Sequence, residues 1–266
     1  MPILHAAGAS YRIDGVLFDK DGTLLDFIHT WGNWSERLLA KFSALLLERG
    51  LPPVGVDLDA LWGALRAEDG FVADYDRRGP LAMGTVNDML IILAWQGYRA
   101  GLSWAEAKTL AADAKRWADE QLDATRSVRL LPGVLDFLEA CRLVGLRLAV
   151  VTADETEAAV KHLEWLGIRE RFAAIIGTDQ VERGKPYPDM AVLACERLGL
   201  RDGRFAVIGD TEGDMSMGKE AGAAASILIS ASNATAASYA ISGSSHADAV
   251  VATLRELNIA KEESPT

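Results

Sequence analysis

Five short and nearly continuous apolar runs constrain the fold of this chain more than any other feature. Runs of this length, without regular polar alternation, are typical of parallel strands that are covered on both faces. We therefore expect one parallel sheet of five or more strands, formed by residues 15–19, 147–152, 173–177, 204–210 and 225–230.

The stretches between these later runs have the periodicity and the end signals of helices. A glycine closes each of them, and a proline lies near the first turn of the earliest one. The alternation of strands and helices predicts a doubly wound α/β fold with a Rossmann-like core. The helices are expected at residues 131–145, 155–166 and 189–198.

Residues 27–125 have a different pattern, which contains amphipathic helices and no strand-like run. The sequence therefore predicts two domains: an α/β core of residues 1–26 and 126–266, and an inserted, all-helical domain of residues 27–125. Within the insert we expect helices at residues 31–50, 58–67 and 86–95, and one that Ser103 caps and that ends near Leu122. In the core we expect an Ala- and Ser-rich loop at residues 231–245 and a last helix at 247–257.

The formal net charge of −11 argues against nucleic acid as a partner, because no basic stretch is long enough to follow a phosphate backbone. No apolar segment reaches the 18 residues typical of a membrane span, and no leader pattern precedes the first strand. A cytoplasmic location and no membrane partner are therefore expected. Cys141 and Cys195 lie in apolar helical segments and are expected to be buried thiols.

Polar residues follow the strands at the edge where an open parallel sheet binds its ligands. Asp19 and Asp21 end the first strand, and Thr152 ends the second. Two carboxylates held so close repel each other unless a cation lies between them. Carboxylate oxygens suit Mg²⁺, and the hydroxyl and a lysine suit an anion. The remaining polar residues at this edge are Lys185, Asp210 and Asp214.

In order and spacing, these elements resemble the four motifs of the haloacid dehalogenase-like hydrolases. The resemblance covers residues 13–258, and the helical block resembles the cap domain of the phosphoglycolate phosphatase-like branch. The elements are Asp19-Lys20-Asp21-Gly22-Thr23, Thr152, Lys185 and Gly209-Asp210-Thr211-Glu212-Gly213-Asp214.

The resemblance implies a Mg²⁺-dependent phosphatase. Asp19 would be the nucleophile that forms an aspartyl-phosphate, and Asp21 would protonate the leaving oxygen and later deprotonate water. Asp19, the backbone carbonyl of Asp21 and Asp210 would hold Mg²⁺, with Asp214 bound directly or through water. The substrate would be a small phosphorylated metabolite such as phosphoglycolate or a sugar phosphate.

The resemblance also implies how the substrate is bound. Thr152, Lys185 and the backbone N–H groups around Asp21 and Gly22 would bind the phosphate oxygens, and Gly22 would allow the tight turn there. Residues of the cap domain would grip the leaving group, and the candidates are Trp31, Arg77 and Arg78. An arginine pair could bind a carboxylate such as that of phosphoglycolate.

Two other functions are compatible with the same aspartates: a hexose-phosphate mutase and a phosphate-binding regulatory protein without turnover. The chain also departs from the family at two places. Lys20 replaces a residue that is mostly apolar in the phosphatase branch, and Ala153-Asp154 follows Thr152 where many relatives have an asparagine. Strand alternation predicts that Lys20 points away from the two aspartates, toward the cap side or toward solvent.

Overall fold

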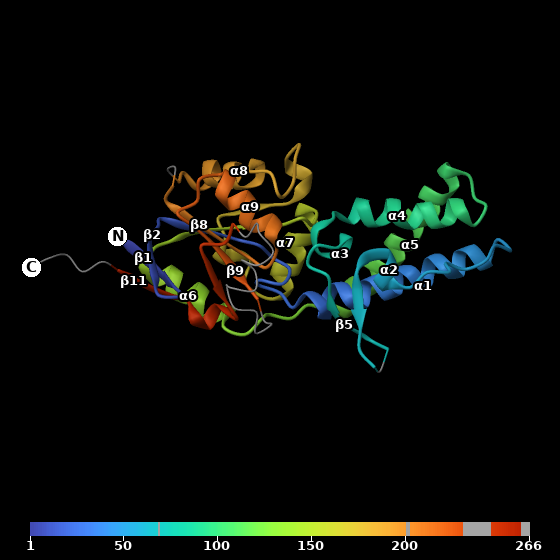
Figure 1. Ribbon diagram of the computed structural model, residues 1–266, viewed down its shortest axis with the longest axis horizontal. Helices are drawn as coiled ribbons and strands as arrows, with labels where there is room; N and C mark the ends of the chain where they lie inside the picture. Colours follow the sequence, from blue (N-terminus) through green and yellow to red (C-terminus); the bar gives the residue numbers. More distant parts are fainter. Residues whose placement is uncertain (69, 201–202, 231–245, 262–266) are drawn as a thin grey trace, which may run out of the picture. The chain divides into compact units, whose positions relative to one another are not determined.

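The computed structural model describes residues 1–68, 70–200, 203–230 and 246–261. The chain divides into two compact units (Figure 1). The core unit consists of residues 1–26 and 130–266, and the inserted unit consists of residues 27–129.

A parallel sheet forms the centre of the core unit, and it confirms the predicted α/β class. Its strand order is β10-β9-β8-β3-β6-β7, and every pair of neighbours is parallel. In chain order, the five predicted runs form β3, β6, β7, β8 and β9. The strands are β3 (Gly15–Phe18), β6 (Arg147–Val151), β7 (Ala174–Ile176), β8 (Phe205–Gly209), β9 (Ala225–Ile229) and β10 (Ala249–Val251).

Helices cover both faces of this sheet, which is why β3 is buried along its whole length. On one face, Leu17 belongs to an apolar cluster with Met190 and Ala194 of α8 (Asp189–Leu198), and α9 (Glu212–Glu220) lies beside α8 (Figure 1). On the other face, the ring of Phe18 meets Phe137 of α6 (Val134–Val144) edge to face at 6.0 Å. The helix α7 (Thr156–Trp165) packs against β7.

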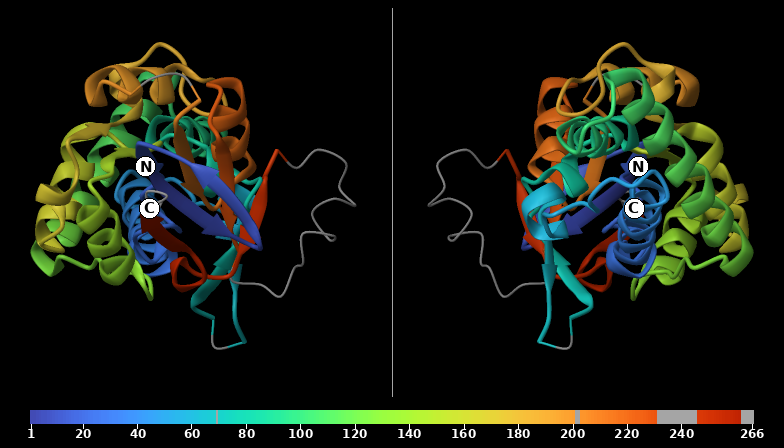
Figure 2. Two further views of the ribbon diagram at one scale, coloured as in Figure 1. Left: turned by 90° about the vertical axis from the view of Figure 1, so that its left-hand side faces the viewer. Right: turned by 90° about the vertical axis from the view of Figure 1, so that its right-hand side faces the viewer.

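A second, antiparallel sheet joins the two ends of the core unit (Figure 2). β1 (Pro2–Ala6) pairs with β2 (Ala9–Arg12) on one side and with β11 (Asn258–Lys261) on the other. The predicted helix at residues 247–257 is wrong, because β10 and a short 3₁₀ turn (Leu254–Glu256) occupy that stretch. The apolar residues of β10 extend the parallel sheet beside β9. The predicted loop at 231–245 lies outside the described residues.

The inserted unit is built mainly of helices. The helix α4 (Val86–Arg99) packs on α5 (Trp104–Thr125), and α5 packs on α1 (Asn33–Leu47). A capping box of Ser103 and Glu106 begins α5, as the sequence predicts. The remaining helical elements are η1 (Ile28–Gly32), α2 (Leu58–Trp62) and α3 (Pro80–Met83).

The expectation of an all-helical insert needs a correction. Gly63, at φ +79°, ends α2 in a left-handed conformation, so the predicted helix at 58–67 cannot continue. An antiparallel hairpin of β4 (Ala64–Arg66) and β5 (Val72–Tyr75) follows. Among the residues that the structure describes, no helix is both long and apolar enough to span a membrane.

Candidate active site

A tight turn after β3 carries the two aspartates of the first motif. The N–H of Asp19 donates to the carbonyl of Ile208 at 2.8 Å, which continues the sheet pairing up to the nucleophile candidate. The N–H groups of Leu24 and Leu25 both donate to the carbonyl of Lys20 at 2.9 Å, so the chain folds back within a few residues. The turn therefore fixes the backbone of both aspartates.

Register brings the other strand ends to the same edge. Phe18 lies opposite Val150 on one side and opposite Ile208 on the other. The residues two positions further along those strands, Thr152 and Asp210, therefore flank the acidic turn, and both are buried. The structure thus brings together the polar residues that the sequence placed at the strand ends.

The first turn of α9 orients Asp214. Thr211 begins this helix with a capping box, in which one oxygen of Asp214 accepts from the Thr211 hydroxyl at 2.5 Å and from its backbone N–H at 3.1 Å. Ligand oxygens of Asp19, Asp210 and Asp214 all lie within 4.8 Å of one another. Three carboxylates of this kind form a cluster with the right atoms for a hard cation.

Lys185 lies inside this cluster. Its ammonium is 2.5 Å from Oδ1 of Asp19 and 2.6 Å from Oδ1 of Asp214, and only 8% of its side chain is exposed. Burial lowers the pKa of Lys185, but Asp19 and Asp214 more than compensate, and the net pKa is raised. The raised pKa favours the charged form of Lys185 at the site.

The cluster nevertheless has more negative than positive charge. Burial raises the pKa of Asp19, Lys185 opposes this effect, and the carboxylates of Asp214, Asp210 and Asp21 raise the pKa further. The pKa of Asp19 is well above its ordinary value as a result. A divalent cation among these oxygens would keep Asp19 ionised, so the residues present fit Mg²⁺.

Gly22 allows the tight turn after β3, as its residue type predicts. Its N–H donates to the carbonyl of Leu25 at 2.8 Å, so this one of the N–H groups around Asp21 and Gly22 is engaged within the turn. Its φ of +90° is left-handed, and an added Cβ would overlap the carboxylate of Asp210. Gly22 therefore allows the turn to approach Asp210 closely.

Thr152 is 1% exposed and directly follows β6. Its backbone N–H donates to the carbonyl of Ile176 at 2.9 Å, and its hydroxyl oxygen accepts from the N–H of Asp154 at 3.2 Å. An acceptor role for the hydroxyl oxygen leaves its proton for another acceptor, as a phosphate contact requires.

The placement expected for Lys20 is wrong. Its side chain is fully buried, so it does not point to solvent, and its ammonium contacts Asp21 instead of pointing away from both aspartates. Nζ lies 2.6 Å from Oδ2 of Asp154, 2.9 Å from Nδ1 of His162 and 3.0 Å from Oδ2 of Asp21. The sequence signalled Lys20 and Asp154 as two separate departures from the family pattern, but it gave no sign that they pair or that His162 joins them.

The candidates for the leaving group lie in the inserted unit, and the structure separates them by burial. Trp31 is 8% exposed and meets Trp34 edge to face at 5.2 Å. The Arg77 guanidinium bonds to Asp74 at 2.7 Å and lies over the ring of Tyr75 at 4.3 Å. The Arg78 side chain, by contrast, is 87% exposed.

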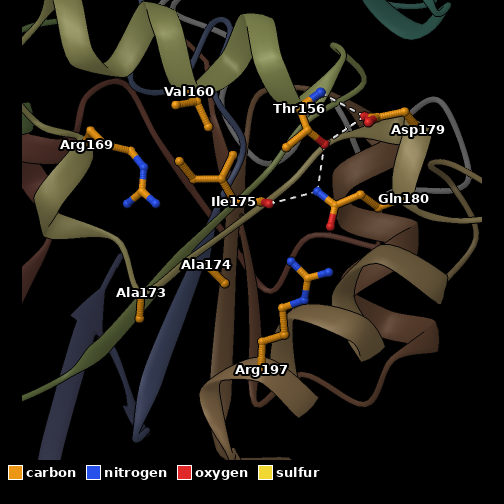
Figure 3. A pocket seen from close by; sticks show the side chains of 9 residues that line it. All are labelled: Thr156, Val160, Arg169, Ala173, Ala174, Ile175, Asp179, Gln180 and Arg197. Atoms are coloured by element: carbon orange, nitrogen blue, oxygen red, sulfur yellow. Dashed lines mark hydrogen bonds between the residues drawn. The ribbon is translucent and has the colours of Figure 1, made fainter.

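A pocket of about 320 Å³ lies beside β7, the edge strand of the sheet (Figure 3). Gln180 donates to the Thr156 hydroxyl at 2.6 Å and to the carbonyl of Ile175 at 3.0 Å, and Asp179 accepts from Thr156. These bonds tie the segment after β7 to the start of α7. None of the predicted site residues lines this pocket.

Comparison with known proteins gives a match over most of the chain. The family model for haloacid dehalogenase-like hydrolases matches residues 13–222. A phosphoglycolate phosphatase of Shigella flexneri is 29% identical over 232 residues, which cover 79% of each protein.

Two solved structures show the same fold at low identity. A β-phosphoglucomutase from Clostridium difficile has a TM-score of 0.59 at 18% identity, and the match covers 92% of both chains. A hydrolase from Pseudomonas syringae has a TM-score of 0.57 at 20% identity, and it covers 91% of this chain and 94% of the other.

Proposed function

The chain belongs to the haloacid dehalogenase-like hydrolases, and we propose that it hydrolyses a small phosphate monoester at the acidic edge of its sheet. The observation that carries this proposal is the placement of Lys185 between Asp19 and Asp214, with Asp210 beside them. Phosphoryl transfer depends mainly on positioning and on neutralising negative charge, and this site supplies both.

In the proposed reaction, an oxygen of Asp19 attacks the phosphorus and forms an aspartyl-phosphate. The bond from phosphorus to the leaving oxygen breaks, and Asp21 gives that oxygen its proton. Asp21 then takes a proton from water, and the water oxygen attacks the phosphorus. The bond from phosphorus to the Asp19 oxygen breaks, inorganic phosphate leaves, and the Asp19 carboxylate is regenerated.

The residues that would hold Mg²⁺ are Asp19, Asp210 and the backbone carbonyl of Asp21. The carboxylate of Asp214 already accepts from Thr211 and contacts Lys185, which supports a ligand role through water. When bound, the cation would neutralise charge on the transferring phosphoryl group.

Thr152 and Lys185 are the proposed phosphate-binding side chains. Both are buried at the end of the sheet. In such a site a hydroxyl donor and an ammonium interact with a phosphate more strongly than they do in water. We assign to the inserted unit the role of a cap domain, which selects the leaving group of the substrate. The name of the Shigella flexneri relative supports phosphoglycolate as the first ester to test, with sugar phosphates next.

The test is phosphate release from a panel of small phosphate esters, with Mg²⁺ and with EDTA. Asp19→Asn should lose release entirely, and Asp136→Asn, which changes an exposed aspartate of α6, should keep it. Phosphate release by wild type in EDTA, together with release by Asp19→Asn, would refute the proposed mechanism. Transfer of phosphate within a sugar phosphate, without free phosphate, would identify a mutase. Phosphate binding without either reaction would indicate a regulatory protein.

A further inference from the structure

Lys20 is the centre of a buried charged cluster, of which the proposed reaction uses only Asp21. Its ammonium has three N–H donors, and the acceptors Asp154, His162 and Asp21 match them at 2.6, 2.9 and 3.0 Å. Burying a lysine is costly unless its charge is paired and hydrogen bonded, and this cluster meets both conditions.

Two of the acceptors hold the ammonium from the side of α7. Asp154 is fixed at two points, because its Oδ1 accepts from the N–H of Glu155 at 2.8 Å and its own N–H donates to Thr152. His162 is 1% exposed, and burial together with Lys20 lowers its pKa to about 3. The ring is therefore neutral, and its Nδ1 accepts from the ammonium.

The third acceptor connects the cluster to the reaction. Asp21 lies one residue beyond Lys20, and its Oδ2 contacts the ammonium. A carboxyl group that exchanges a proton with substrate must be held within about 0.5 Å and 10–20° of its working geometry by neighbouring groups. A contact from a fully anchored ammonium provides this restraint.

We propose that Lys20 is a positioning residue for Asp21. Anchored by Asp154 and His162, its ammonium contacts Oδ2 of Asp21 and so orients the carboxyl group, whose other oxygen carries the proton that passes to the leaving oxygen. The inference rests on the proposed phosphatase function, and it concerns the step in which the leaving-group bond breaks.

The chemistry of the leaving group separates this role from a purely structural one. An alkoxide is a poor leaving group and needs the proton of Asp21, whereas 4-nitrophenolate is a weak base and departs without one. The ratio kcat/KM contains only the steps up to departure of the leaving group, so hydrolysis of the aspartyl-phosphate does not enter it.

The experiment compares kcat/KM for 2-phosphoglycolate, or the best alkyl phosphate of the panel, with that for 4-nitrophenyl phosphate. In Lys20→Met, kcat/KM for the alkyl ester should fall about 100-fold, which is within the usual range for general acid catalysis. For the aryl ester, kcat/KM should fall by about tenfold at most. Lys219→Met makes the same change at a lysine of α9 that is 60% exposed, and it should leave both esters unchanged.

Lys20→Met alone leaves Asp154 buried without its cation and can fail to fold for that reason. The double variant Lys20→Met/Asp154→Asn removes both charges, and it should show the same selective loss. In an Asp21→Asn background, Lys20→Met should not change the ratio between the two esters any further.

Each outcome decides between the hypotheses. A folded Lys20 variant in which kcat/KM falls equally for both esters, or for neither, would overturn the positioning role. The proposed phosphatase function would remain. Failure of the wild type to release phosphate from any ester would overturn the proposed function itself.

Discussion

The ammonium of Lys185 lies 2.5 Å from the oxygen of Asp19 that faces it, and both side chains are 8% exposed. The lysine reaches this position from a loop 166 residues further along the chain. A surface lysine would be hydrated and mobile, whereas this one is the buried counter-ion of the proposed nucleophile. Lys185 therefore has the position needed to neutralise charge on a transferring phosphoryl group.

Replacing this ammonium should reduce catalysis strongly. We expect Lys185→Met to lower kcat for phosphate release about 100- to 1000-fold, as is usual when one donor to the developing charge is removed. Steady-state kinetics at saturating Mg²⁺ is the measurement, and Lys219→Met is the control. A Lys185 variant that retains the kcat of wild type would place the lysine outside the reaction.

The close approach of Gly22 to Asp210 gives a second prediction. Gly22→Ala should lose more than the roughly 1–2 kcal/mol that a left-handed φ costs alanine, because its Cβ would also displace the Asp210 carboxylate. Its Mg²⁺ requirement for phosphate release should rise as well. Urea unfolding and a Mg²⁺ titration of activity test both effects.

Gly222 is the matched control, because its φ is +76° and nothing lies within 4 Å of an added Cβ. Gly222→Ala should therefore show the backbone cost alone. Equal losses of stability in the two variants, with an unchanged Mg²⁺ titration, would mean that the contact with Asp210 has no role.

The parallel sheet could be predicted because burial on both faces leaves a local mark, the continuous apolar run. The edge elements left no such mark. Residues 249–251 form a strand because they pair with the edge of β9, and β9 is not adjacent to them in the sequence. The predicted helix at 58–67 included the first strand of the hairpin after Gly63, because its pairing with β5 leaves no local mark in the sequence.

The candidate site was predictable to the same extent. Residues at the ends of parallel strands meet at one edge, so Asp19, Thr152 and Asp210 could be placed together from the strand pattern alone. The partners of Lys20 could not be placed, because strand alternation indicates a direction only while the strand continues. The chain turns at this residue, and its side chain meets Asp154 and His162, which lie more than 130 positions away.

The two arginines of the inserted unit should behave differently. Arg77→Ala removes an ion pair with Asp74 and the packing on Tyr75, and we expect it to cost about 1 kcal/mol of stability. Arg78→Ala should leave stability unchanged and raise KM for phosphoglycolate about tenfold, equivalent to roughly 1.4 kcal/mol of binding. Thermal unfolding and KM for both variants decide this, and an unchanged KM in Arg78→Ala would remove this residue from the specificity candidates.

Burial of His162 makes the stability of the protein depend on pH. In the unfolded chain a histidine takes up a proton below about pH 6.5, whereas the folded chain holds His162 neutral down to a pKa of about 3. Lowering the pH through this window therefore favours unfolding, by up to about 1.4 kcal/mol per pH unit. His162→Asn keeps a hydrogen-bond acceptor for Lys20 but does not titrate, so its stability should fall less steeply as the pH is lowered.

Urea unfolding at intervals from pH 7 to pH 4.5 measures the difference, and His5→Asn is the control for losing a histidine elsewhere. Identical slopes for wild type and His162→Asn would show that His162 takes up its proton in the folded protein too, and that the cluster around Lys20 tolerates a second positive charge.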